Sequence, residues 1–117
     1  MDQVELKKRT KEFAKSVINL CRQLPNTREG RLIGDQLFRS GTSVGANYRA
    51  ACRGRSKPDF TSKMGIVLEE ADETLYWLEI LGETGVVKAE LLVALTREAG
   101  ELVAIFAASV KTARLSR

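Results

Sequence analysis

The sequence predicts an all-α protein, folded as an antiparallel up-down-up-down four-helix bundle that occupies residues 1–117 as a single domain. Three observations favour this fold class. Four long segments carry apolar residues at intervals of three, four and seven positions, which is the period of an amphipathic helix. The breaks between these segments are short, so neighbouring helices must run antiparallel. No run of alternating polar and apolar residues is long enough to indicate a strand.

The first helix is predicted over 3–24, where apolar residues recur on one face. The tripeptide Pro-Asn-Thr at 25–27 ends this pattern. Either Asn26 or Thr27 is suited to cap the second helix, because its side chain accepts a hydrogen bond from a backbone amide of the first turn.

The second helix is predicted over 28–53. Its apolar stripe also carries the polar residues Ser40 and Asn47. Buried polar groups need hydrogen-bond partners. We therefore expect these two side chains to bond across to the third or fourth helix and to fix the register of the bundle, as isolated buried polar residues do in coiled coils.

The third helix is predicted to begin in the segment 56–59, which offers a serine cap, an early proline and an acidic residue against the helix dipole. It runs to about residue 81, because Gly82 and Gly85 then end it. The fourth helix is predicted over 88–115.

The composition and the amino-terminal sequence indicate where in the cell the protein resides. No apolar run approaches the roughly 18 residues of a membrane span. The amino terminus lacks the apolar core of a signal peptide. Cys21 and Cys52 stand among apolar or small neighbours, so both are expected to be reduced. We expect a cytoplasmic protein that does not contact a membrane.

The same composition excludes most catalytic chemistry. The chain has no histidine, so its serines lack a general base and the usual nitrogen ligands for zinc are missing. The acidic segment 69–73 cannot form a di-iron site, because that site needs histidines on facing helices. Neither an enzyme nor a bound metal or cofactor is expected.

Charge is unevenly distributed within the formal net value of +4: segment 1–27 carries +3, 28–57 carries +5 and 58–90 carries −6. Five basic side chains flank the second break between helices, and they are the candidate nucleic-acid-binding residues Arg49, Arg53, Arg55, Lys57 and Lys63. Such a patch binds phosphates when it is exposed. The alternative is that these charges are simply solvated or are neutralised by the acidic segment.

Two helices carry more apolar surface than one bundle core needs. The candidate contact residues on these second faces are Phe38, Gly41, Gly45, Tyr48 and Trp77. Two glycines one turn apart allow another helix to approach closely, although each costs about 1 kcal/mol in a helix interior. The pattern favours a homo-oligomer interface, and the alternative is a broad intramolecular core.

One set of residues resembles a known bacterial family of four-helix bundles. The set comprises Arg39, Ser43, Val44, Asn47, Arg53, Ser56, Phe60, Glu73 and the segment Leu-Tyr-Trp-Leu-Glu at 75–79. The chain resembles the proteins encoded in 23S rRNA intervening sequences, and it is similar to the accessory variability determinants of diversity-generating retroelements. The resemblance covers almost the whole chain and is most specific between residues 39 and 81.

The resemblance implies a ring-shaped homopentamer and no catalytic residues. It also implies that RNA, DNA, a reverse transcriptase or another nucleic-acid-processing protein is a partner. The signature positions Arg39, Ser43, Asn47 and Glu73 carry over as structural residues, with Glu73 as a partner for a basic residue of the second helix. The chain departs from many relatives at Ala50 and at 69–70. The predicted function is non-enzymatic nucleic-acid binding by a homo-oligomer, and the alternative is a protein-interaction scaffold.

Overall fold

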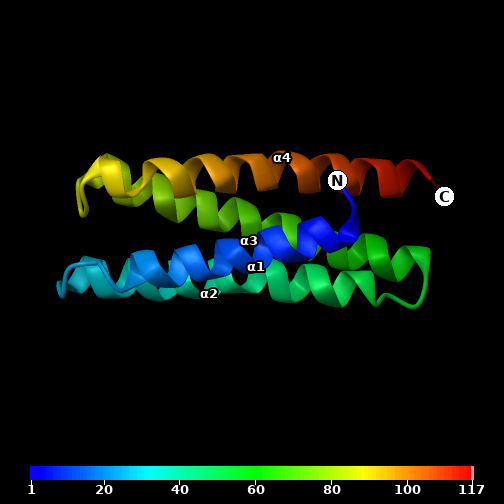
Figure 1. Ribbon diagram of the computed structural model, residues 1–117, viewed down its shortest axis with the longest axis horizontal. Coiled ribbons are helices and arrows are strands. Elements are labelled where there is room, and N and C mark those ends of the chain that lie inside the picture. The colour runs from blue at the N-terminus through cyan, green and yellow to red at the C-terminus, as the bar shows by residue number, and fades with distance from the viewer. Residues whose placement is uncertain (117) are drawn as a thin grey trace.

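The structure, a computed structural model, describes residues 1–116 as an elongated bundle of helices measuring 47 × 22 × 19 Å (Figure 1). The elements in chain order are α1 (Gln3–Cys21), α2 (Arg28–Cys52), α3 (Lys57–Thr84), the short 3-10 helix η1 (Ala89–Leu91) and α4 (Val93–Leu115). No strand occurs within residues 1–116. The all-α class and the four predicted helices are confirmed.

The helices pack in chain order. α1 lies against α2, α2 against α3 and α3 against α4, whereas α1 and α4 touch at few positions. The start of α1 and the end of α4 lie at the same end of the bundle (Figure 1). One of the four seams between neighbouring helices is therefore much more open than the other three.

The end of α1 differs from the prediction. The helix ends at Cys21 rather than at residue 24. The backbone amide of Gln23 bonds to the carbonyl of Leu20 at 2.9 Å, and that of Leu24 bonds to Cys21 at 3.3 Å. These bonds span three residues instead of four, so the last turn is tighter than an α-helix. Pro25 explains the change, because helical angles are disfavoured for the residue before a proline.

Two side-chain caps begin the next helices. The side chain of Thr27 accepts a hydrogen bond from the amide of Gly30 at 3.1 Å at the start of α2. Ser56 accepts one from the amide of Asp59 at 3.2 Å at the start of α3. Both caps agree with the sequence analysis, and Thr27 rather than Asn26 is the cap of α2.

The turn between α3 and α4 corrects two predicted boundaries. α3 continues through Gly82 to Thr84, and Gly85 ends it with φ of 69° in the left-handed region that glycine favours. η1 occupies Ala89–Leu91 before α4 starts at Val93. The fourth helix is thus shorter at its start than the predicted 88–115.

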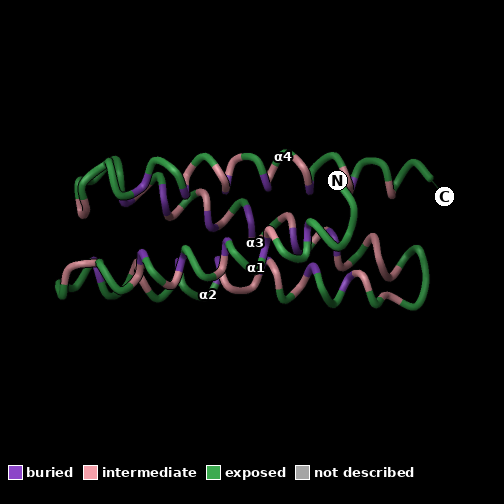
Figure 2. Tube along the Cα trace, in the orientation of Figure 1, coloured by how far each residue is buried: buried purple, intermediate pink, exposed green. Residues whose placement is uncertain are grey.

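The core runs along the inside of the bundle (Figure 2). All four helices contribute fully buried side chains, the largest of which are Phe13, Val17, Leu37, Val44, Met64, Val67, Leu78, Leu81, Leu102 and Phe106. The rings of Tyr48 and Phe106 pack with their centroids 5.6 Å apart and join α2 to α4 across the middle. Removal of this apolar surface from water is the main stabilising term of the fold.

Polar groups inside the core are paired. The hydroxyl oxygens of Ser40 in α2 and Thr74 in α3 lie 3.0 Å apart in a hydrogen bond, and both residues are fully buried. The predicted cross-helix bond of Ser40 is therefore confirmed. The same prediction for Asn47 is wrong, because its side-chain amide donates to the carbonyl of Ser43 within α2 at 2.9 Å.

Candidate nucleic-acid interface

The turn between α2 and α3 carries three exposed basic residues. Arg53 caps the end of α2, Arg55 lies in the turn and Lys57 begins α3. Within residues 1–116, none of the three takes part in an ion pair. Their charges are directed to solvent, where they are available to an anionic partner.

Lys63 differs from its predicted neighbours. Its ammonium group lies 3.1 Å from a carboxylate oxygen of Asp59, one turn earlier in α3. The same carboxylate accepts a hydrogen bond from the backbone amide of Arg55 at 3.1 Å. The amide of Arg55 and then Lys63 hold the pKa of Asp59 below its usual range. Lys63 is therefore already compensated, and its assignment as a free phosphate ligand is not supported by its contacts.

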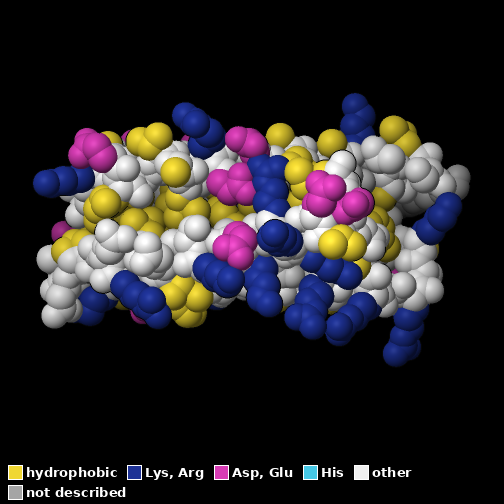
Figure 3. Space-filling view, in the orientation of Figure 1, with side chains coloured by type: hydrophobic (Ala, Val, Ile, Leu, Met, Phe, Trp, Pro, Cys, Tyr) yellow, Lys and Arg dark blue, Asp and Glu magenta, His cyan; other side chains and the backbone are white. Residues whose placement is uncertain are grey.

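Arg49 belongs to a basic groove between α1 and α2. The groove has a volume of about 540 Å³ and is lined by Lys7, Lys8, Lys11, Ala14, Thr42, Gly45, Ala46 and Arg49. Four of the lining residues are cationic and the other four have small side chains or none, and no carboxylate is among them. Lys and Arg side chains gather over this part of the surface in Figure 3.

The three lysines of this basic groove are not among the binding residues predicted from the sequence. Residues 7, 8, 11 and 15 fall within about 100° of each other around a helix with 3.6 residues per turn, so a lysine stripe on α1 was visible in the sequence. What the sequence did not show is that this stripe lies beside Arg49. Of the four lysines, Lys15 is engaged by Glu12 at 3.0 Å.

The acidic segment of α3 does not neutralise the basic groove. Arg39 in α2 contacts Glu70 at 3.0 Å and also bonds to Glu73. The indole N–H of Trp77 donates to the carboxylate of Glu73 at 3.1 Å. Arg39 first, and then Trp77, lower the pKa of Glu73. Arg39 is thus the basic residue of α2 that contacts Glu73.

The other two signature residues continue the Arg39 cluster along α2. The hydroxyl of Ser43 donates to the carbonyl of Arg39 at 2.6 Å, and Asn47 donates to Ser43 as described above. Each bond reaches back one turn within the same helix. These contacts are structural, and of the three residues Arg39 is the one that contacts α3, through Glu70 and Glu73.

Three residues assigned to an oligomer interface lie against other parts of the same chain. A Cβ atom at Gly41 would come within 2.6 Å of the Val17 side chain, and one at Gly45 within 3.2 Å of the Thr10 backbone oxygen. The absence of side chains at the two glycines therefore allows α1 of the same chain to pack closely against α2. Tyr48 is buried in the core. The assignment of Gly41 and Tyr48 to an outer contact face is wrong, because both are buried. Gly45 also lines the basic groove, and its place in an oligomer interface stays a prediction.

The remaining two interface candidates do reach the surface. Phe38 is 47% exposed, and Trp77 is half-buried beside the exposed Tyr76, with the two ring centroids 5.0 Å apart. Their place in an oligomer interface stays a prediction.

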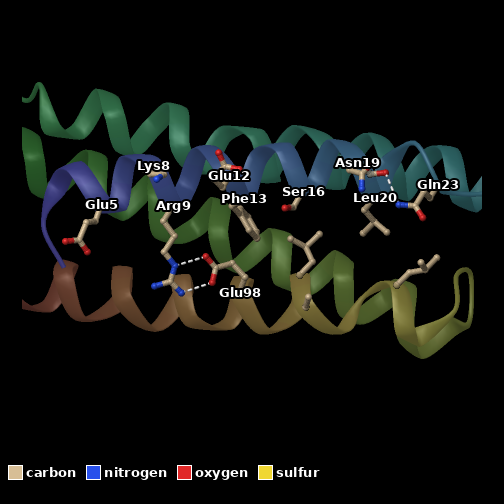
Figure 4. Close-up of a pocket in the computed structure, with 13 residues that line it drawn as sticks. Glu5, Lys8, Arg9, Glu12, Phe13, Ser16, Asn19, Leu20, Gln23 and Glu98 are labelled. Carbon is tan, nitrogen blue, oxygen red and sulfur yellow. Dashed lines mark hydrogen bonds and ion pairs between the residues drawn. The ribbon is translucent and has the colours of Figure 1, made fainter.

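A second cleft follows the open seam between α1 and α4 (Figure 4). It has a volume of about 530 Å³, and Phe13, Leu20 and Leu95 lie at its base. Arg9 bridges the two helices, with nitrogen to oxygen distances of 2.6 Å to Glu98 and 2.7 Å to Glu101. These carboxylates raise the pKa of Arg9. The charges of the seam are mixed, because Glu5, Glu12 and Glu98 line it together with Lys8 and Arg9. The basic groove shares Lys8 with this cleft but has no carboxylate among its lining residues.

Residues 1–116 contain neither a cluster of metal-binding side chains nor a helix suited to span a membrane. No group of three or more potential ligand side chains is placed to hold a metal ion in this part of the chain. None of the helices there combines the length and the apolar character that crossing a bilayer requires.

Comparisons with known proteins agree with the fold. A sequence model of the family described as 23S rRNA-intervening sequence protein matches residues 2–108. The chain is similar to a crystal structure of a protein of unknown function from the S23 ribosomal protein family of Bacteroides thetaiotaomicron. The two are 35% identical over 95% of this chain and 99% of that one, with a TM-score of 0.86. Comparison with curated proteins gives no match.

Proposed function

This chain belongs to the family of 23S rRNA-intervening sequence proteins, and from that premise we propose that it is a cytoplasmic, non-enzymatic protein that binds nucleic acid through the basic groove. The family description links the chain to ribosomal RNA. A reverse transcriptase or another nucleic-acid-processing protein is a candidate partner, in keeping with the resemblance to retroelement accessory proteins.

One observation carries the proposal. The groove collects Lys7, Lys8, Lys11 and Arg49 without a carboxylate among its lining residues. Like charges gathered at one place repel each other, so the arrangement raises the local positive potential and favours an anionic ligand. The exposed cations at the nearby turn between α2 and α3 extend the same positive surface.

Binding of a labelled structured RNA across a salt series tests the proposal. The double variant Lys7→Glu/Lys11→Glu should weaken binding at least about thirtyfold at 0.15 M salt, because two phosphate contacts are lost and each contributes about 0.9 to the salt slope. The matched control is Lys88→Glu/Lys111→Glu, which makes the same charge change at exposed positions outside the groove. Equal weakening by both variants, or no binding by the unmodified protein at low salt, contradicts the proposal and favours a protein-interaction scaffold.

The proposal includes self-association into a homo-oligomer, with the ring-shaped homopentamer as the expected form. Exposed apolar side chains on α3 support it: Ile66 is 44% exposed and Tyr76 is 52% exposed. A small chain gains stability when such surface is covered by a second copy.

Native mass measurement tests this part. The unmodified protein should have five times the 13.0 kDa mass of one chain. Ile66→Glu/Tyr76→Glu should reduce the mass to that of the monomer, whereas Leu115→Glu, an exposed apolar position at the end of α4, should not. A monomeric unmodified protein at micromolar concentration would rule out the oligomer.

A further inference from the structure

The geometry points to a specific ligand class for the basic groove: we infer that it holds the phosphate backbone of a double helix, without sequence preference and without stacking on bases. This inference rests on the proposed function and refines it. It follows from which side chains line the groove, from where the aromatic side chains lie, and from how the cations are spaced.

The groove has no flat ring on which a base can stack. Its lining consists of three lysines, one arginine and four residues with small side chains or none. Proteins that bind single strands combine a positive groove with aromatic side chains that stack successive bases. Of these two features, the groove has only the positive charge.

The aromatic residues of the chain lie elsewhere. Phe13, Tyr48 and Phe106 are buried in the core, and Phe60 is half-buried against it. Tyr76 and Trp77 lie on α3, with Trp77 bonded to Glu73. The remaining ring belongs to Phe38.

Phe38 is the exposed aromatic side chain of α2, and it lies one turn before Thr42, whereas Tyr48 beside Arg49 is buried. It lines a different depression, at the α1–α2 turn, together with Leu24, Pro25 and Asp35. Along α2 it is about 16 Å from Arg49, at 1.5 Å per residue. One ring at this distance does not make a platform for successive bases.

The cations are placed to follow a backbone. Lys7 and Lys11 are one turn apart on α1, about 6 Å along the axis, and Arg49 faces them from the antiparallel α2. The lining residues Gly45 and Ala46 are small, so a strand of phosphates can approach the helices closely between the lysines and Arg49. Lysine ammonium groups act as point charges toward phosphates, and contacts to phosphates carry no direct information about base sequence.

A double helix suits this groove better than a single strand. The salt slope is the fall in the logarithm of the binding constant per unit increase in the logarithm of the salt concentration. If each of the four cations contacts one phosphate, this slope is about 3.6 with a duplex and about 2.8 with a single strand, because the duplex has the denser counterion atmosphere. At 0.15 M salt this difference corresponds to about fivefold tighter binding of the duplex. Base stacking, which normally favours single strands, offers no compensation here.

The test measures competition at equal total phosphate between an unstructured uridine strand and an RNA duplex of about 20 base pairs, longer than the ~16 base pairs spanned by one double-stranded-RNA-binding domain. A second duplex of scrambled sequence and the variant Phe38→Leu are included. The duplex should bind about fivefold tighter at 0.15 M salt, the two duplex sequences should bind equally, and Phe38→Leu should leave both affinities unchanged.

The opposite outcomes are distinct. Tighter or equal binding of the single strand, or loss of its binding in Phe38→Leu, overturns the inference but leaves nucleic-acid binding intact. A preference for one duplex sequence overturns the claim of backbone recognition. Absence of binding to every probe at low salt overturns both the inference and the proposed function.

Discussion

The hydroxyl groups of Ser40 and Thr74 form a hydrogen bond of 3.0 Å between α2 and α3 at a place where both residues are completely buried. The hydroxyl of Thr74 also bonds to the carbonyl of Glu70 at 2.7 Å. A buried hydroxyl that loses its partner retains its desolvation penalty, so the two residues are energetically coupled.

We predict that Ser40→Ala and Thr74→Val each destabilise the fold by about 1 to 2 kcal/mol, and that the double variant is less destabilised than the sum of the two, because both polar groups are then removed together. Urea unfolding at a fixed protein concentration measures the three values. Thr84→Val is the control, since the exposed hydroxyl of Thr84 bonds only within its own helix. Additive effects in the double variant would contradict the coupling.

Close packing of α1 on α2 leads to a second prediction. Gly41→Ala should destabilise the protein by about 1 to 3 kcal/mol in spite of the better helix propensity of alanine, because its Cβ meets the branched Val17 side chain. Gly100→Ala is the matched control: nothing lies within 4 Å of an added Cβ there. That control should stabilise the helix by up to about 1 kcal/mol. Thermal unfolding compares the two, and a stabilised Gly41→Ala protein would show that α1 and α2 are not in close contact at this position.

The helix caps and the close contact at Gly41 differ in how far the sequence predicts them. Caps such as Thr27 and Ser56 were predictable because their chemistry is local, involving a side chain and an amide three residues away. The position of Gly41 was not, because periodicity separates the faces of a helix without identifying the neighbour that covers each one. The lysine stripe of α1 escaped assignment for the same reason, since its proximity to Arg49 depends on the register between two helices.

Pro25 and Asn47 show two other limits of prediction from sequence: the position of a helix end and the partner of a polar side chain. The early end of α1 depends on one residue type outside the periodic pattern, and such boundary effects are small compared with the signal of the helix itself. Asn47 satisfies its side-chain donor within its own helix, an option that spacing alone does not distinguish from a bond across the bundle.

The ion pair between Arg39 and Glu73 predicts a dependence of stability on pH. Arg39 and Trp77 lower the pKa of Glu73 from its ordinary value of 4.5. Because the pKa is lower in the folded than in the unfolded chain, the contribution is fully present above about 4.5 and is lost as the pH falls through the folded value. Glu73→Gln should therefore cost about 1 kcal/mol at pH 7, discounted for partial exposure, and much less at pH 3.

Urea unfolding followed by Trp77 fluorescence measures this difference. Glu79→Gln in the same helix is the control, because Glu79 is exposed and forms no ion pair within residues 1–116. An equal loss of stability at pH 7 and pH 3 would show that the charge of Glu73 is not the cause.

The contrast between Arg49 and Lys63 gives the last prediction. Arg49 faces the lysines of the basic groove, whereas Lys63 is neutralised by Asp59 at 3.1 Å. Arg49→Gln should lower the salt slope of duplex binding by about 0.9, the value for one phosphate contact. Lys63→Gln should leave the slope nearly unchanged. Equal effects would mean that the ligand lies across the α2–α3 turn rather than along the groove, because at the turn both side chains are within reach of one phosphate chain.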